Sequence, residues 1–180
     1  GMTVEAMRQY WRRRYVPGNI TLVAAGRVDF DRLVVSARRY CGHWESGPGG
    51  REFTPVQPQE QCQLVHKPSV SQQYVIQLAA APGAEDRRRY AAALLATILG
   101  DDIGSRLFWA LVDPGLAETA TLTYSEYQEI GLFSTFLASP PEQMPRNFHT
   151  VRQIYARAAQ EEPIREDELQ LAKTKICSHL

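Results

Sequence analysis

The side chains in this sequence that are best suited to metal binding or nucleophilic chemistry are its histidines and cysteines. The four histidines lie far apart in the chain, at His43, His66, His149 and His179. None of them belongs to an H-E-x-x-H, an H-x-x-E-H or a Cys/His zinc spacing, which are the patterns that bring several ligands to one metal ion. The three cysteines are odd in number and form no C-x-x-C pair, so we expect reduced thiols at Cys41, Cys62 and Cys177. The sequence therefore predicts no metal site.

Motifs for nucleophilic catalysis and for phosphate binding are also missing from the sequence. There is no G-x-S-x-G turn to expose a serine, no G-x-x-x-x-G-K-[ST] loop and no G-x-G-x-x-G turn. Arginine runs at 12–14 and 87–89 lie on predicted amphipathic helices, where a charge run usually faces water and less often forms an anion site. The acidic run at 166–168 suits the first turn of a helix. We predict no catalytic residue.

The elements that position these side chains belong to a chain of globular composition. It has 180 residues, 44% of them hydrophobic, and its 20 Lys and Arg balance 20 Asp and Glu. Neutral charge argues against a basic nucleic-acid-binding module, and no run approaches the ~20 apolar residues of a membrane helix. The sequence opens without a signal peptide. We expect a soluble protein with no nucleic-acid partner and no membrane span. The sequence leaves its compartment open, and both the bacterial cytoplasm and the periplasm are compatible with it.

Residues 1–44 predict a helix, a strand and a second helix. Apolar residues recur at helical spacing over 3–14. The short, β-branched segment Ile20 to Ala25 predicts a strand, and Asp29 is a suitable N-cap for the helix that follows. A strand without a partner exposes unpaired main-chain groups. We therefore expect Ile20 to Ala25 to complete a sheet formed by the later residues, either within one chain or by exchange between the two chains of a homodimer.

A linker and a second region follow. Residues 45–60 are rich in Pro, Gly and polar side chains, which predicts the linker. In the second region, 61–180, strands are expected at 61–66, 70–80, 117–126 and 131–138, and helices at 85–100 and 105–111, after Pro141 and around 166–176. The predicted fold is α+β, with a mixed, mostly antiparallel sheet of four or five strands and helices packed on one face.

Several segments form an ordered pattern along the chain. They are Y-V-P-G-N at 15–19, G-R-V-D at 26–29, I-L-G at 98–100, G-S-R-L-F at 104–108, G-L-A at 115–117, G-L-F at 131–133 and the segment 168–173. In this order the sequence resembles the pitrilysin/insulinase-type zinc metallopeptidases, the M16 family. Each segment alone is weak, but together they cover nearly the whole chain and their order makes the resemblance specific.

The resemblance implies how the chain relates to a larger enzyme. Members of that family carry zinc on an H-x-x-E-H helix in their first domain, which would precede Gly1 here. Residues 1–44 then resemble the end of that catalytic-type domain, and residues 61–180 resemble most of the following C-terminal-type domain, which has no zinc. The resemblance therefore implies that this chain binds no cofactor and that the parent enzyme binds zinc. In the family, paired domains enclose a chamber, and a substrate peptide adds as a strand to the catalytic domain.

The resemblance also suggests residues for contact with a substrate peptide. These are Arg106, Phe108, Glu118 and Tyr124. The family's usual Arg and Tyr in this stretch are associated with substrate, but this sequence has Val112 and Glu118 in their places. Either the lobe is architectural or it uses Glu118 and Tyr124 differently. Arg106 is open to a second interpretation, in which its planar fork bonds helix ends or a nearby carboxylate.

Taken together, the resemblance implies a non-catalytic lobe of an M16-like zinc-dependent metalloendopeptidase. Such a lobe would be inactive alone and would shape the substrate chamber of a parent enzyme that hydrolyses peptides. Its partners would be the catalytic domain of the same parent chain or a partner subunit, and a peptide substrate. The alternative is a structural or assembly subunit of the same fold with no peptidase activity.

Overall fold

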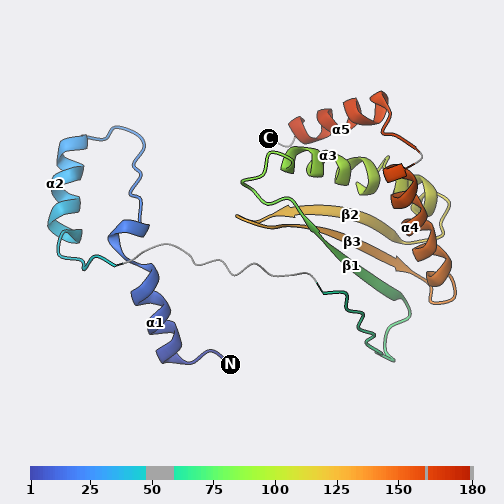
Figure 1. Ribbon diagram of the computed structural model, residues 1–180, viewed down its shortest axis with the longest axis horizontal. Coiled ribbons are helices and arrows are strands. Elements are labelled where there is room, and N and C mark those ends of the chain that lie inside the picture. Colours follow the sequence, from blue (N-terminus) through green and yellow to red (C-terminus); the bar gives the residue numbers. More distant parts are fainter. Residues whose placement is uncertain (48–58, 161, 179–180) are drawn as a thin grey trace. The chain divides into compact units, whose positions relative to one another are not determined.

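The chain forms two compact units. The computed structural model describes residues 1–47, 59–160 and 162–178 (Figure 1). The first unit is Gly1–Gln57 and the second is Pro58–Leu180. This division lies within the predicted linker 45–60, most of which is outside the described residues.

The first unit contains the two predicted helices. Helix α1 spans Val4–Arg14 and is capped by Thr3, whose Oγ1 accepts the backbone N–H of Ala6 at 3.2 Å. A 3₁₀ turn, η1, follows at Pro17–Asn19. Helix α2 spans Phe30–Cys41, and Asp29 Oδ1 accepts the N–H of Arg32 at 3.1 Å. Both helices therefore begin where a short oxygen-bearing side chain satisfies a free backbone donor.

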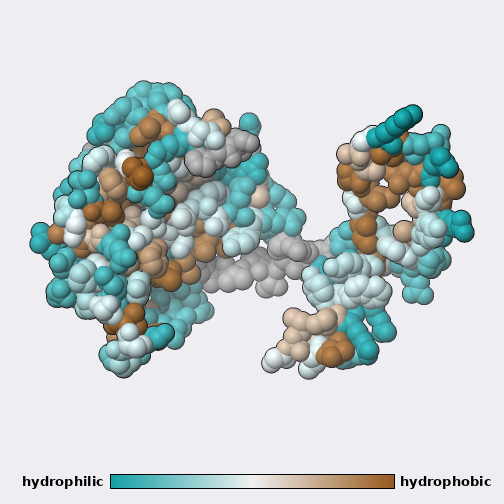
Figure 2. Space-filling view, turned by 180° about the vertical axis from the view of Figure 1, so that it is seen from behind, coloured by the Kyte–Doolittle hydropathy of each residue, from teal (hydrophilic) through white to brown (hydrophobic). Residues whose placement is uncertain are grey.

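The predicted strand in the first unit is not formed. Residues 20–25 have no strand assignment, and Leu22 and Val23 are 64% and 81% exposed. β-branched composition favours an extended backbone, but a strand also needs a neighbour for its main-chain groups. Completion of a sheet by this segment, within one chain or by exchange between two chains, stays a prediction. Among the described residues of this unit only Val16 is a buried apolar residue, and Figure 2 shows apolar side chains at its surface.

The second unit is built on a three-stranded antiparallel sheet. Its strands are β1 (Gln73–Ala81), β2 (Thr119–Glu126) and β3 (Gly131–Ser139), in the order β1-β3-β2. Strands β2 and β3 form a hairpin in which the N–H of Tyr127 donates to the carbonyl of Ile130 at 2.9 Å. The α+β class, the antiparallel pairing and the hairpin are confirmed.

The number of strands differs from the prediction. Residues 61–66 have no strand assignment, and Leu64 and Val65 are 86% and 75% exposed. The described residues therefore form three strands instead of four or five, and every pairing among them is antiparallel. A short apolar run indicates a strand only when one of its faces is buried, and here neither Leu64 nor Val65 is covered.

Helices α3 (Arg89–Gly100) and α4 (Met144–Gln160) cover one face of the sheet, and α5 (Glu166–Ser178) lies against α3 (Figure 1). A short π-helical turn, η2 (Phe108–Val112), follows α3. The core lies between this helical layer and the sheet, and its most buried apolar residues are Leu107, Leu111, Leu137 and Val151. The other face of the sheet exposes Tyr74, Ile76 and Leu78, and the Tyr74 ring stacks on Phe136 with centroids 6.0 Å apart.

Gly100 sets how closely α3 approaches the sheet. It is the last residue of the helix and is buried. A Cβ atom at this position would overlap the backbone N and Cα of Leu122 in β2. Only glycine allows the end of α3 to lie directly on β2.

Candidate functional site

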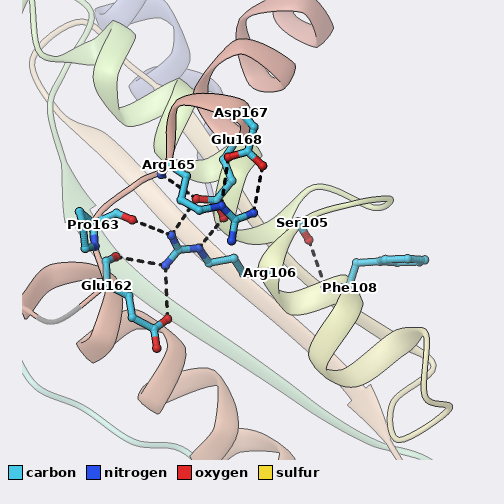
Figure 3. Close-up of polar contacts among 8 residues, drawn as sticks. All are labelled: Ser105, Arg106, Phe108, Glu162, Pro163, Arg165, Asp167 and Glu168. Atoms are coloured by element: carbon cyan, nitrogen blue, oxygen red, sulfur yellow. Dashed lines mark hydrogen bonds and ion pairs between the residues drawn. The ribbon is translucent and has the colours of Figure 1, made fainter.

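Arg106 forms the most connected polar group of the second unit. Its Nε donates to Oε1 of Glu168 and its Nη2 donates to Oε2, both at 2.8 Å (Figure 3). Nη2 also donates to the carbonyl of Pro163 at 3.2 Å, and Nη1 donates to the carbonyl of Glu162 at 3.4 Å. Both side chains of the pair are only 14% exposed. The guanidinium thus joins the start of η2 to the segment that leads into α5.

Local structure positions both partners. Ser105 is 2% exposed, and its Oγ accepts the N–H of Phe108 at 3.1 Å, which begins the helical turn that carries Arg106. Glu168 lies in the acidic first turn of α5, as expected, and its Oε2 also accepts the N–H of Arg165 at 2.9 Å. A glutamate that reaches back to a backbone N–H satisfies a free donor of its own helix. Glu168 therefore caps α5 and binds Arg106 with one carboxylate.

The electrostatics follow from these bonds. Hydrogen bonding from Arg106 holds the pKa of the Glu168 carboxyl below its ordinary value, against the opposing effect of burial. The same bond raises the pKa of Arg106. Both groups are therefore charged at neutral pH, and a guanidinium whose donors already bind protein oxygens has little capacity left for a ligand.

Tyr124 is anchored at the other end of the sheet. Its hydroxyl donates to the carbonyl of Pro82 at 2.6 Å, and its ring lies 5.6 Å from that of Phe133. Burial raises the pKa of the phenol. The side chain thus links the end of β1 to the hairpin. The phenol remains protonated at neutral pH, and its hydroxyl is already hydrogen-bonded to the carbonyl of Pro82.

The other two candidate residues differ in exposure. Phe108 is half-buried in η2 and meets Trp109 edge-on, with ring centroids 5.0 Å apart. Glu118 is exposed just before β2, and its backbone N–H donates to the carbonyl of Ala138 at 2.9 Å. Its carboxylate is therefore accessible, whereas its backbone belongs to the sheet.

The structure does not gather the four candidates around one cavity. Arg106 lines a cavity of about 210 Å³ between η2 and α5. Tyr124 lines a different cavity, of about 350 Å³, between α3 and β2. Neither cavity is lined by a second candidate. In the described structure, no single substrate pocket is therefore formed by Arg106, Phe108, Glu118 and Tyr124.

The cavity between α3 and β2 is a site that the sequence did not reveal. We call it the β2 groove. It is lined by Ala93, Ala96, Thr97, Gly100, Asp101, Asp102, Thr121, Leu122, Thr123, Tyr124 and Ile176. The sequence signals are the small residues at helical spacing on α3 and the alternating threonines of β2. These signals indicate a groove only once α3 and β2 are known to lie side by side.

A second set of polar contacts lies next to the β2 groove. Lys175 of α5 binds the carboxylate of Asp101 and the carbonyl of Ile103. Asp101 follows the end of α3, so this contact fixes α5 to α3 near the β2 groove. Together with the Arg106 contacts, it attaches α5 at two points along its length.

Among the residues that the structure describes, the arginine runs and His43, His66 and His149 add no further site. Arg88 pairs with Asp86 in the turn before α3, and Arg89, the first residue of α3, lies 3.6 Å from Glu126. The prediction that the whole run 87–89 lies on a helix is wrong, because Arg87 and Arg88 precede the helix. Within residues 1–47, 59–160 and 162–178, no three His, Cys, Asp or Glu side chains come together as metal ligands. These residues do not fit a zinc ion, so no step of zinc chemistry is assigned to them. No described helix has the length and apolarity to cross a bilayer.

Comparison with known proteins gives the family context. A family model described as the peptidase M16 inactive domain matches residues 1–176. A zinc protease of Rickettsia felis is 26% identical over 179 residues, which cover 99% of this chain and 43% of the relative. A zinc protease of Mycobacterium bovis is 31% identical over 163 residues, which cover 86% of this chain and 36% of the relative. The chain therefore spans less than half the length of these relatives.

Solved structures share the fold. The peptidase M16 inactive domain from Pseudomonas fluorescens superposes with a TM-score of 0.81 at 21% identity, over 98% of this chain and 43% of that chain. A chain in complex III2 from Candida albicans gives a TM-score of 0.78 at 14% identity, over 99% of this chain and 44% of that chain. The arrangement of strands and helices described above is therefore found in proteins of very different sequence.

Proposed function

Because the chain belongs to the family of peptidase M16 inactive domains, we propose that it is the non-catalytic lobe of an M16-type zinc metalloendopeptidase and that it shapes the chamber in which the parent enzyme hydrolyses peptides. The observation that carries this proposal is the family match, which runs through both units of the chain. The zinc proteases among its relatives support the activity of the parent.

Polar contacts within the second unit support a role for this lobe as a rigid wall of the chamber. The Arg106–Glu168 pair and the Lys175–Asp101 contact hold α5 against the layer that covers the sheet. A wall of a chamber must keep its shape while substrates enter and leave, and these partly buried, hydrogen-bonded ion pairs hold the packed elements in one geometry. In this proposal Arg106 positions α5, and substrate contact falls to other residues of the lobe.

The test compares the 180-residue chain with its parent protein. Zinc content is measured by mass spectrometry, and cleavage is followed with a fluorogenic peptide library. The parent is expected to hold one zinc and to cleave peptides. The isolated chain is expected to do neither. A parent variant lacking residues 61–180 should keep its zinc and lose cleavage. Cleavage by the isolated chain, or full cleavage by the truncated parent, would reject the proposal.

A second candidate function is a structural or assembly subunit without peptidase activity. Two observations favour it: Val112 and Glu118 stand where the resemblance placed substrate-associated Arg and Tyr, and a chain of the complex III2 of Candida albicans has the same fold. If the parent protein is such a subunit, it should hold no zinc and cleave no peptide, and it should co-purify with a partner chain. The zinc measurement on the parent separates the two functions.

A further inference from the structure

A cavity of about 230 Å³ lies between the sheet and the helices that cover it (Figure 1). We call it the inner cavity. Helices α3 and α4 form its walls, and all three strands contribute to its floor. Residues directly opposite each other in an antiparallel ladder point to the same face, and the register places Thr135 of β3 between Gln77 of β1 and Leu122 of β2. The floor of the inner cavity is therefore a continuous row of side chains across the sheet.

The walls of the inner cavity are mostly apolar. Helix α3 contributes Leu95 and Leu99, helix α4 contributes Ala158 and Ala159, and β3 adds Phe133. The alanine side chains are short, and this leaves the space beside them open. An apolar cavity of about 150 Å³ is large enough to hold one benzene molecule. The inner cavity is therefore large enough for a molecule slightly larger than a single aromatic ring.

A pair of hydroxyl groups lies in this apolar surrounding. Thr135 is only 3% exposed, and its Oγ1 lies 2.9 Å from the hydroxyl oxygen of Tyr155 on α4, so that either oxygen can donate to the other. Two hydroxyls carry two hydrogens, and the bond between them uses only one. Neither hydroxyl has another hydrogen-bond partner within the part of the chain that the structure describes. One O–H donor is therefore left without a protein acceptor.

This spare donor is present at neutral pH. Burial raises the pKa of Tyr155, against the opposing effect of the bond to Thr135, so the phenol keeps its proton. A donor that is removed from water without an acceptor costs free energy. An acceptor atom on a molecule inside the cavity would remove this cost.

The inner cavity can be reached from the surface. Gln77 and Ala79 of β1 and Ala159 of α4 line it, and all three are exposed. A small molecule can therefore enter beside β1 without separation of the helices from the sheet.

From these observations we infer that the inner cavity binds a small, uncharged and mostly apolar molecule that carries one hydrogen-bond acceptor, such as a ketone or an ester. Its apolar part packs on Leu95, Leu99 and Phe133. Its oxygen accepts the spare hydrogen of the Thr135–Tyr155 pair. An ion does not fit, because none of the described residues that line the cavity carries a charge that could pair with it.

A side chain of a second copy of the protein is the other possible occupant. An aliphatic side chain would fill the apolar space, but it has no acceptor and would leave the spare O–H unpaired. A carbonyl-bearing small molecule satisfies both the apolar walls and the donor.

This inference goes beyond the proposed function and is independent of it, because binding is measured on the 180-residue chain without any proteolysis. A bound molecule contacts α3, α4 and the sheet at the same time. It should therefore stabilise their packing, and the midpoint of thermal unfolding should rise with ligand concentration.

The first experiment compares two probes, acetophenone and α-methylstyrene. They have nearly the same shape, but α-methylstyrene has a CH₂ group in place of the carbonyl oxygen. Binding to the 180-residue chain is followed by NMR titration, in which both probes should shift the amide signals of Leu95, Phe133 and Ala158. The carbonyl stretching band of bound acetophenone should lie at a lower wavenumber than in hexane, because its oxygen accepts a hydrogen bond.

A double variant removes the hydroxyl pair. Thr135→Val combined with Tyr155→Phe replaces both partners by apolar groups of similar shape, a change that is often nearly neutral for stability. The double variant should bind acetophenone roughly fivefold more weakly than the wild type, or worse. It should bind α-methylstyrene at least as tightly as the wild type does. If the double variant does not fold, the carbonyl band in the wild type decides alone.

The second experiment fills the inner cavity. Ala158→Phe places a ring in it and should abolish binding of both probes. Ala156→Phe is the matched control, because Ala156 is exposed on the same helix and does not line the cavity. Circular dichroism verifies that both variants fold. If Ala158→Phe does not fold, the smaller Ala158→Leu takes its place.

Any of five results would overturn the inference. These are absence of acetophenone binding, a carbonyl band at its position in hexane, equal binding of acetophenone to the wild type and the double variant, unchanged binding to the folded Ala158 variant, and a dimer that Ala158→Phe disperses and Ala156→Phe does not. The last result would mean that a second copy of the chain fills the cavity.

Discussion

Arg106 and Glu168 lie 62 residues apart in sequence and form a two-point ion pair, Nε to Oε1 and Nη2 to Oε2, with both distances at 2.8 Å. Each side chain is 14% exposed. This pair joins the turn that follows α3 to the first turn of α5. The polar attachment of α5 to the rest of the second unit therefore consists of one guanidinium, the carbonyls it also binds, and the contacts of Lys175, in addition to the packing of the buried Ala172.

Removing the guanidinium should destabilise the second unit. Arg106→Ala leaves a mostly buried carboxylate without its main partner, and we expect the free energy of unfolding to fall by about 1–3 kcal/mol. Arg165→Ala is the control, because Arg165 pairs with Asp167 at the surface, where an ion pair contributes less than about 1 kcal/mol. Urea denaturation at pH 7 measures both. Equal losses in the two variants would show that the Arg106–Glu168 pair has no special role.

The same pair should make stability depend on pH. The folded-state pKa of Glu168 lies below its unfolded value of about 4.3, so its contribution is complete above that value and is lost as pH falls through the folded-state pKa. The difference in unfolding free energy between the wild type and Glu168→Gln should therefore be constant from pH 7 to 6 and shrink below about pH 4. A difference that grows on acidification would contradict this assignment.

Gly100→Ala should reverse the usual effect of alanine in a helix. Alanine is normally favoured over glycine within a helix by about 1 kcal/mol. Here the added methyl group would overlap the backbone of Leu122, and we expect a net loss of about 1–3 kcal/mol. The midpoint of thermal unfolding measures the change. A rise in the midpoint would mean that α3 moves away from β2 without cost.

The first unit should exchange its amide hydrogens far faster than the second. Its helices have 11 and 12 residues, a length that is marginal for an isolated helix, and neither has a buried residue. Amides of α1 and α2 should therefore show little protection, whereas those of β3 and α4 should be protected. In the full parent protein we expect the amides of α1 and α2 to become protected. Strong protection in the isolated chain would indicate a partner surface within it.

Sequence patterns predicted those elements that depend on local chemistry. Asp29 caps its helix, the acidic turn at 166–168 begins α5, and the hairpin turns where it was expected. Each depends on residues a few positions apart. The segments at 20–25 and 61–66 have the composition of strands but are not paired, because a strand depends on a partner that its own sequence does not specify.

The features of the candidate site also fall into those that the sequence predicts and those that depend on the tertiary structure. The sequence alone determined the family pattern, the neutral charge and the lack of recognisable metal and nucleotide motifs. Only the tertiary structure decided that Arg106 binds Glu168, that Tyr124 binds Pro82, and that α3 and β2 enclose a groove. The physical reason is that these relationships join residues tens of positions apart, and their distances are set by how helices and strands pack.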